Sequence, residues 1–265
     1  MIARTHETKI SGQPIVGLAM RLLSALVLLA SLGLMITCAS GCKAEAAPDA
    51  GYTDKTAMAK DPLIPFHKVW RKPGVDWSGY KKIYIAPVNT QYMLSITGWD
   101  AGVRKDEIEK DVAELATYTR DRLRKDFKED PAHRYIVLDT PSKDRDVLEF
   151  EFAIVEVVPS KVVLNALGWV PFGVGMTLNA VRFIAKDQSC VSFEARGRDG
   201  ATREIVFTAA DRESQQSTII DTRDLTWYSH ARGIIDDWSK QFVAIANRKQ
   251  GEKVEDTSAF RLKPW

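Results

Sequence analysis

The sequence predicts an α+β fold, a two-layer sandwich in which two main amphipathic helices cover one face of a mixed, mostly antiparallel sheet. Apolar residues recur every three or four positions in two long segments, residues 104–128 and 224–249. Between these segments lie several short stretches in which apolar and polar residues alternate, as in half-buried strands. Elements with one apolar face each must bury those faces against one another, which favours two packed layers.

The first expected strand covers residues 82–88, where strong β formers alternate. Pro87 indicates that this strand lies at a sheet edge or ends there. The helix predicted for residues 104–128 follows. It places one apolar row along its length, made of Ile108, Val112, Leu115, Leu123 and Phe127.

Four further strands are expected after this helix. Residues 135–138 form a short apolar run, and residues 147–154 alternate over a longer stretch. Residues 191–195 and 204–208 are predicted to pair as a hairpin, because the Asp199-Gly200 dipeptide between them favours a turn. The second helix, residues 224–249, would then close the fold.

This final helix carries Ala231, Ile235, Trp238, Phe242 and Ile245 on one face. Gly251 is the expected C-cap residue, since glycine readily takes the left-handed conformation at helix ends.

The first 41 residues have the layout of an export signal. Basic residues precede an apolar run at residues 22–36, and small residues then lead to Cys42. The run is shorter than the roughly 20 residues that a spanning helix needs. We therefore expect a signal peptide over residues 1–41 that is removed, with Met20 as an alternative start of translation.

Ala39-Ser40-Gly41-Cys42 resembles the bacterial lipobox, whose cysteine carries diacylglycerol. The resemblance implies that Cys42 is the lipidated N-terminal residue of the mature protein. Lys43 follows it, and by resemblance to the enterobacterial sorting rule this residue implies an outer-membrane protein that faces the periplasm. Cys38 is the competing site, but Thr37 before it fits the pattern poorly.

The charge balance excludes nucleic acid as an expected partner. The chain has 37 Lys and Arg against 35 Asp and Glu, and loss of Arg4, Lys9, Arg21 and Glu7 with the signal leaves 34 of each sign. Nucleic-acid binders usually carry a basic surplus. Membrane attachment is therefore expected to depend on the lipid. Cys190 would be the only other cysteine, which leaves no pair for an intramolecular disulfide.

Residues 42–61 are small and polar, and we expect them to form a lipidated flexible tether of about 25 Å. A single domain over residues 62–265 is expected to follow. This domain contains an unusually apolar insert at residues 162–181. Two interpretations of the insert remain open: it packs on the domain's own core, or it is an exposed patch that contacts the membrane or a partner through Trp169 and Phe172.

Residues with catalytic potential do not form a recognisable site in the sequence. The mature chain's histidines, His67, His133 and His230, lack metal-ligand spacing, and no cofactor is expected. Ser229, His230 and Asp236 are the residue types of a catalytic triad. However, adjacent helical residues diverge by about 100°, which opposes that geometry.

Charged residues around the predicted hairpin are interpreted as a solvated edge. Four arginines alternate there with four acids, namely Arg196, Arg198, Arg203 and Arg212 with Glu194, Asp199, Glu204 and Asp211. The pairs Glu149/Glu151 and Asp236-Asp237 are likewise expected to face solvent. Cys190 is expected to be a small buried strand residue.

The segment Trp70-x-x-Pro73-Gly74-Val75-Asp76-x-x-x-Tyr80, together with the strand after it and the closing Asp237-Trp238-x-x-Gln241-Phe242, resembles the bacterial lipoprotein family of domain of unknown function 3313. The resemblance implies a lipid-anchored envelope protein and supplies no catalytic residues. The order of elements is also similar to that of auxiliary lipoproteins of envelope transport systems.

These expectations combine into a lipid-anchored envelope lipoprotein that is not an enzyme. It would bind or support another envelope component, through an envelope protein partner or self-association. A periplasmic carrier of a lipid or small apolar ligand is the alternative, and an uncharacterised hydrolase is the third possibility.

Overall fold

The computed structural model describes residues 45–94, 105–158, 188–216 and 229–256, which belong to one compact unit. Within these ranges the strands are β1 (Lys68–Arg71), β2 (Lys82–Ile85), β3 (Ile136–Leu138), β4 (Val147–Val158), β5 (Gln188–Asp199) and β6 (Ile205–Gln216). The helices are α2 (Lys105–Lys128), α5 (Ser229–Asn247) and the short 3-10 helix η1 (Trp77–Gly79).

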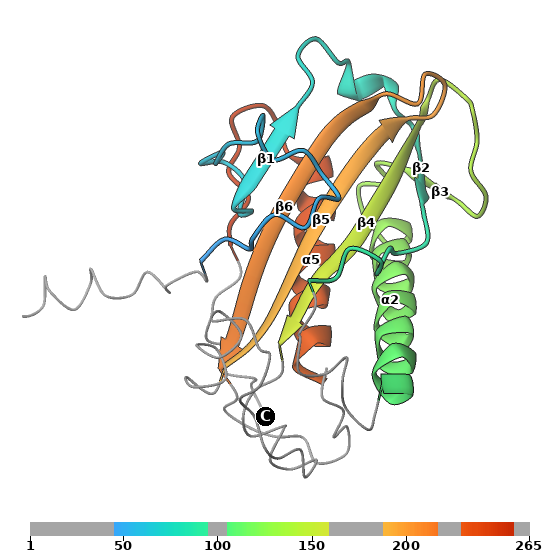
Figure 1. Cartoon of the computed structure of the whole chain (residues 1–265). Coiled ribbons are helices and arrows are strands. Elements are labelled where there is room, and N and C mark those ends of the chain that lie inside the picture. The colour runs from blue at the N-terminus through green and yellow to red at the C-terminus, as the bar shows by residue number, and fades with distance from the viewer. Residues whose placement is uncertain (1–44, 95–104, 159–187, 217–228, 257–265) are drawn as a thin grey trace, which may run out of the picture. The chain divides into compact units, whose positions relative to one another are not determined.

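The six described strands form one open, mixed sheet in the order β1-β6-β5-β4-β2-β3 (Figure 1). β4, β5, β6 and β1 pair antiparallel, whereas β2 runs parallel to both β4 and β3. Helix α2 connects β2 to β3, because parallel neighbours need a crossover connection. The predicted α+β sandwich is confirmed.

Both helices pack on one face of the sheet, which we call the helix face (Figure 1). Helix α2 buries the row predicted for it at Leu115, Leu123 and Phe127, and α5 buries Trp238 and Phe242. These side chains meet the apolar positions of the long strands. Within this core six aromatic side chains contact one another: Phe66, Phe150, Phe152, Phe193, Trp238 and Phe242.

Aromatic contacts hold α5 against the middle of the sheet. The rings of Phe193 and Trp238 meet edge to face with centroids 4.6 Å apart, and Phe152 stacks on Phe193 at 4.8 Å. All three side chains are at most 1% exposed. Full burial of an apolar side chain of this size stabilises a fold by roughly 1.5–3 kcal/mol, so this group is a major part of the core.

The hairpin of β5 and β6 has a longer loop than the sequence suggests. Asp199 ends β5, Ile205 begins β6, and Arg203 takes the left-handed conformation with a φ of 64°. Gly200 is needed for close packing, because a Cβ there would lie 2.8 Å from the carbonyl oxygen of Asp144. The Asp-Gly pair begins the turn as predicted: the Asp199 carboxylate accepts hydrogen bonds from the backbone amides of Ala201 and Thr202, and Gly200 packs against the loop before β4.

Two other details differ from expectation. Lys68–Arg71, where no strand is expected from the sequence, forms β1 and pairs with β6. Helix α5 ends at Asn247, so Gly251 is not its C-cap; with a φ of 80°, it lies in the following turn. None of the helices in the described ranges is both long enough and apolar enough to span a membrane.

The expected flexible tether is also different in the structure. Residues 45–58, which we call the N-terminal segment, run along the sheet surface opposite the helices (Figure 1). Tyr52, Thr53, Lys55 and Met58 are each at most 9% exposed. The small, polar composition suggested mobility, but buried partners on the strands hold this segment in place.

Candidate functional site

The surface of the sheet opposite the helices, which we call the outer face, carries charged side chains on its three longest strands. In β4 to β6 most of the residues that alternate with the aromatic core are polar, namely Glu149, Glu151, Glu156, Ser192, Glu194, Arg196, Arg198 and Arg212. The expected solvated edge is therefore wrong in its position, because these strands form the middle of the sheet. Glu149 is only 8% exposed and Glu194 is fully buried.

Ion pairs cross from strand to strand on the outer face. Glu151 of β4 accepts hydrogen bonds from Arg196 and Arg198 of β5, both at 2.7 Å. Arg203 in the hairpin loop pairs with Glu149. Oppositely charged neighbours on adjacent strands stabilise their pairing, and each acid here is neutralised by a base.

Glu194 fastens the N-terminal segment to β5. Its carboxylate accepts hydrogen bonds from the backbone amide of Ala50 at 3.1 Å and from the amide and hydroxyl of Thr53 at 2.7 and 2.9 Å. Lys55 Nζ lies 2.6 Å from the same carboxylate. A buried carboxylate is tolerated only when it is fully paired in this way, so the segment is part of the fold.

Tyr52 supplies the apolar part of this contact. Its ring lies on Ala153 and Val155 of β4, and the Arg196 guanidinium stands 3.9 Å from the ring centroid. Burial raises the pKa of Tyr52 to about 12, although Arg196 acts in the opposite direction. The phenol is therefore neutral at physiological pH and acts as a packing group.

A second buried pair joins β4, β5 and β6. Arg212 Nη2 lies 2.7 Å from Glu156, which also accepts a hydrogen bond from Ser192 at 2.8 Å. Arg212 Nε contacts the sulfur of Cys190 at 3.2 Å. Burial, together with the Glu156 charge, raises the pKa of Cys190 to about 12. The predicted buried position of Cys190 is confirmed, and its thiol is a weak nucleophile.

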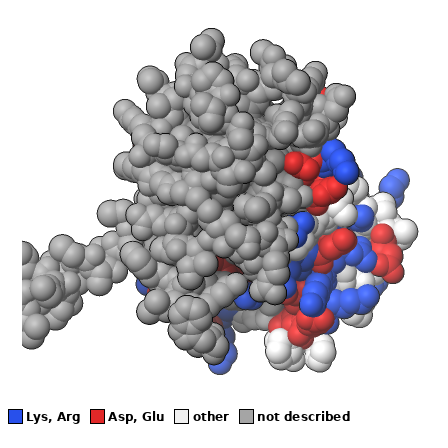
Figure 2. Space-filling model, turned by 90° about the horizontal axis from the view of Figure 1, so that it is seen from below, with Lys and Arg blue, Asp and Glu red and all other residues white. Residues whose placement is uncertain are grey.

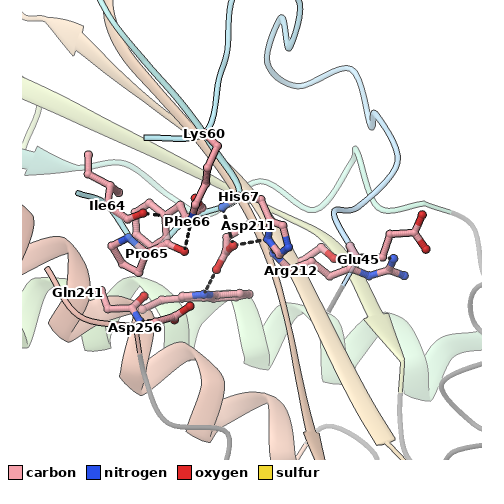
Figure 3. A network of polar contacts seen from close by, with 12 residues as sticks. Glu45, Lys60, Ile64, Pro65, Phe66, His67, Asp211, Arg212, Gln241 and Asp256 are labelled. Atoms are coloured by element: carbon pink, nitrogen blue, oxygen red, sulfur yellow. Dashed lines mark hydrogen bonds and ion pairs between the residues drawn. The ribbon is translucent and has the colours of Figure 1, made fainter. Parts of the chain in front are cut away.

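A histidine and an aspartate meet on the helix face (Figure 3). The buried Asp211 carboxylate receives hydrogen bonds from the backbone amide of His67 at 2.9 Å and from Trp238 Nε1 at 3.0 Å. His67 Nδ1 lies 2.5 Å from the same carboxylate. Asp211 thus links the chain before β1 to β6 and α5. Nearby, Lys60 Nζ donates to the carbonyl oxygens of Ile64, Pro65 and Phe66.

Asp236, one member of the triad considered in the sequence, is engaged in contacts between the two helices. Asp236 accepts a hydrogen bond from Tyr118 at 2.6 Å and pairs with Arg122 at 3.3 Å, so it links α5 to α2. The expectation of solvent exposure is wrong for Asp237, which is 8% exposed. The side chains of Ser229 and His230 lie outside the described residues. Among the described residues, no group of three or more His, Cys, Asp or Glu could hold a metal ion.

An apolar cavity of about 550 Å³ opens where α2 and α5 end against the sheet. Its wall includes Phe127, Leu148, Phe150, Phe207 and Phe242. Small-molecule sites are typically clefts of roughly 300–1,000 Å³ with mostly apolar walls and a few polar groups. A smaller depression of about 290 Å³ near Tyr80 and Asp199 mixes acidic and basic side chains. The larger, apolar cavity is the better candidate for ligand binding.

The polar side of the cavity is basic. Arg71, Arg134, Arg248 and Lys249, which we call the basic rim, line it, and none of the residues in its wall is an aspartate or glutamate. By contrast, the described surface visible in Figure 2 carries Lys and Arg interspersed with Asp and Glu. The basic rim is therefore a local concentration of one sign of charge on a nearly neutral chain.

The members of the basic rim differ in how they are held. Arg134 donates to the carbonyl oxygens of Trp77 and Tyr80 at 2.5 and 2.7 Å, and Arg71 pairs with Asp61 at 2.6 Å. Arg248 donates to the carbonyl oxygen of Glu252 at 3.2 Å. Within the described residues, no carboxylate forms an ion pair with Arg248. Partial burial and the neighbouring Arg71 lower the pKa of Arg248, although the charges of Asp61 and Glu252 act in the opposite direction.

Comparison with known proteins assigns a family to this chain. A family model described as a protein of unknown function (DUF3313) matches residues 59–242. The chain belongs to this family. The DUF3313 match includes all six strands, α2 and most of α5, and it ends at Phe242 in the cavity wall. No curated protein matches the sequence.

Among solved structures, the chain is similar to two of the PelC dodecamer from Paraburkholderia phytofirmans. One, a single-substitution variant, is 9% identical with a TM-score of 0.36, and the match covers 68% of this chain and 98% of that chain. The other is 10% identical with a TM-score of 0.33 and covers 63% and 91%. These values are too low to support a functional argument.

The residues predicted from the sequence to be functional, Cys42, Trp169 and Phe172, lie outside the described residues. The cavity and the fastening of the N-terminal segment were both missed. The sequence does contain a signal for the fastening of the N-terminal segment. Charged residues in β4 and β5 alternate with apolar residues at period two, which indicates a charged face on buried strands.

Proposed function

We propose that this DUF3313 protein is a non-enzymatic binding component of the bacterial cell envelope, anchored to the outer membrane by lipid on Cys42 and facing the periplasm. The observation that supports this most is the fastening of the N-terminal segment, whose first contact with Glu194 is made by Ala50. Seven residues lie between Cys42 and Ala50, and the eight residue steps that join them span at most about 29 Å when fully extended. The anchor would therefore hold the domain close to the membrane.

The use of the charged residues also supports a binding role. Glu151, Glu156 and Glu194 are all engaged by arginine or lysine and by hydrogen bonds from neighbouring strands or the N-terminal segment. General acids, general bases and nucleophiles need to reach a substrate. Carboxylates that are engaged in ion pairs and hydrogen bonds within the domain stabilise its fold and are not available to a substrate.

The anchor is tested by labelling cells that produce the full chain with an alkyne analogue of palmitate. We expect Cys42→Ser to abolish the label and to release the protein from the outer-membrane fraction. Cys38→Ser is the matched control and should change neither result. Label that persists in Cys42→Ser but disappears in Cys38→Ser would contradict the proposed anchor.

A second candidate function, a carrier of a small apolar ligand, is favoured by the cavity at the ends of α2 and α5. Its volume of about 550 Å³ and its aromatic wall suit a hydrocarbon group. Native mass spectrometry of the full-length protein tests this function directly. A bound non-protein mass that is lost when Ala246, a small residue of the wall, is replaced by Leu would support it.

A further inference from the structure

We propose that the cavity binds a single-chain anionic amphiphile, with the hydrocarbon tail against the aromatic wall and a carboxylate or phosphate head group at Arg248 and Lys249. This inference rests on the carrier as the second candidate function and adds the chemical class of its ligand. It does not depend on the lipid anchor.

The tail site follows from the position of the cavity within the core. Phe127 of α2, Phe150 of β4 and Phe242 of α5 are each only 4% exposed, yet all three border the cavity. Core residues of the helix face therefore form the floor of the cavity, and exposed residues such as Lys249 and Gln250 form its opening. A hydrocarbon chain that enters it leaves water for an apolar wall, which is favourable in proportion to the apolar area buried.

The head-group site follows from the available donors. Arg134 is held by backbone carbonyl oxygens and Arg71 by Asp61, so these two are already engaged. Arg248 is half-buried, and within the described residues it donates one hydrogen bond, to a backbone carbonyl oxygen, and forms no ion pair. The charge of Arg71 repels it, whereas the more weakly acting charges of Asp61 and Glu252 attract it. An anion at Arg248 would relieve this repulsion and gain bidentate hydrogen bonds from the guanidinium.

The C-terminal ends of the helices alone do not explain the positive charge of the basic rim. Basic residues at a helix C-terminus stabilise its partial negative charge, and Arg248 and Lys249 directly follow α5. Arg71, however, comes from the end of β1, and Arg134 precedes β3. Four basic residues from three parts of the chain therefore converge on one apolar cavity without an acid in its wall.

The test uses the purified full-length protein in dodecyl maltoside and two photoreactive probes. One is palmitate with a diazirine in the middle of its chain, and the other is the corresponding neutral alcohol. We expect light-dependent adducts of the palmitate probe on peptides that contain Phe150 or Phe242. Unlabelled palmitate or lysophosphatidate should compete, and the stronger competitor indicates whether carboxylate or phosphate is preferred.

The head group is tested with Arg248→Gln/Lys249→Gln, which removes two charges without emptying the cavity wall. Loss of a charge-assisted contact is expected to reduce adducts of the palmitate probe about tenfold, while adducts of the alcohol stay unchanged. Lys240→Gln/Lys253→Gln is the matched control, since Lys240 is exposed on α5 and Lys253 pairs with Glu255 on the surface. Arg248→Gln alone repeats the test if the double variant is unstable.

The outcomes separate the two levels of the proposal. Equal labelling by the alcohol and palmitate probes, with no effect of Arg248→Gln/Lys249→Gln, would overturn the anionic ligand and leave the apolar carrier. Absence of adducts on the cavity peptides from either probe would overturn both. Neither result bears on Cys42, whose role is decided by metabolic labelling.

Discussion

Glu194 accepts two hydrogen bonds from Thr53, one from its backbone amide at 2.7 Å and one from its hydroxyl at 2.9 Å, across 141 residues of chain. Both groups are buried. This contact, together with the Lys55 ion pair, makes residues that look like a linker in the sequence part of the folded domain.

The Glu194→Ala variant is expected to release the N-terminal segment. It leaves the Lys55 ammonium and the Thr53 amide without their buried partner, which should lower the free energy of unfolding by about 3–5 kcal/mol. Urea denaturation measures the loss, and hydrogen exchange at residues 50–58 should accelerate. Glu204→Ala is the control, because its exposed pair with Lys72 should contribute at most about 1 kcal/mol. Unchanged exchange in Glu194→Ala would contradict the fastening.

The Glu156–Arg212 pair is expected to couple strongly in a double-mutant cycle. Arg212→Leu alone leaves a buried carboxylate without its cation and should cost about 3–5 kcal/mol of unfolding free energy. Glu156→Leu/Arg212→Leu removes both charges and should cost less than the sum of the two single changes. Additive losses in urea denaturation would show that the pair does not act as a unit.

Asp130 is expected to make the domain sensitive to acid. Burial alone would raise its pKa, but hydrogen bonds from Asn247, Arg134 and Ala132 lower it below the ordinary value. Because the folded-state pKa is the lower one, the stabilisation is fully present above about pH 4 and is lost as the pH falls through the folded-state value.

The measurement is urea denaturation of wild type and Asp130→Asn between pH 6 and pH 2. The variant should be less stable near pH 6, and its stability should fall less steeply below pH 4. Glu255→Gln, at an exposed side chain, should follow the wild-type curve. Parallel curves for wild type and Asp130→Asn would refute this role of Asp130.

The apolar insert at residues 162–181 has its own test. If Trp169 and Phe172 contact the membrane or a partner, replacing both with Asp in the Cys42→Ser background should abolish any membrane association that survives loss of the lipid. Co-sedimentation with membranes measures the association, and thermal melting checks the fold. An unchanged association by a folded variant would exclude this patch as a docking site.

Local patterns predicted the layers of this fold well. The steps between Leu115, Leu123 and Phe127, and between Trp238 and Phe242, indicated which side of each helix is buried. The structure confirms these positions, since the apolar period of a helix depends on nearby residues alone. The alternation in β4 similarly predicted Phe150 and Phe152 as core residues.

The candidate sites could not be predicted in the same way, because they depend on contacts between distant residues. β1 was missed because its four residues pair with β6, about 140 positions away. The N-terminal segment was interpreted as a tether from composition, which does not reveal a partner such as Glu194. The cavity is lined by residues of β1, β4, α2 and α5, which are far apart in the sequence. Its existence and volume depend on how these elements pack, which no single stretch of sequence shows.

The attachment of the N-terminal segment to β5 has a mechanical consequence. Among the described strands, β5 has two on one side of it and three on the other. A pull on the chain before Glu45 would act on interior strands of the sheet, first through Arg212 of β6 and then through Glu194 and Arg196 of β5, rather than on an edge strand. A domain tethered at this end would resist tension along the direction in which its anchor is pulled.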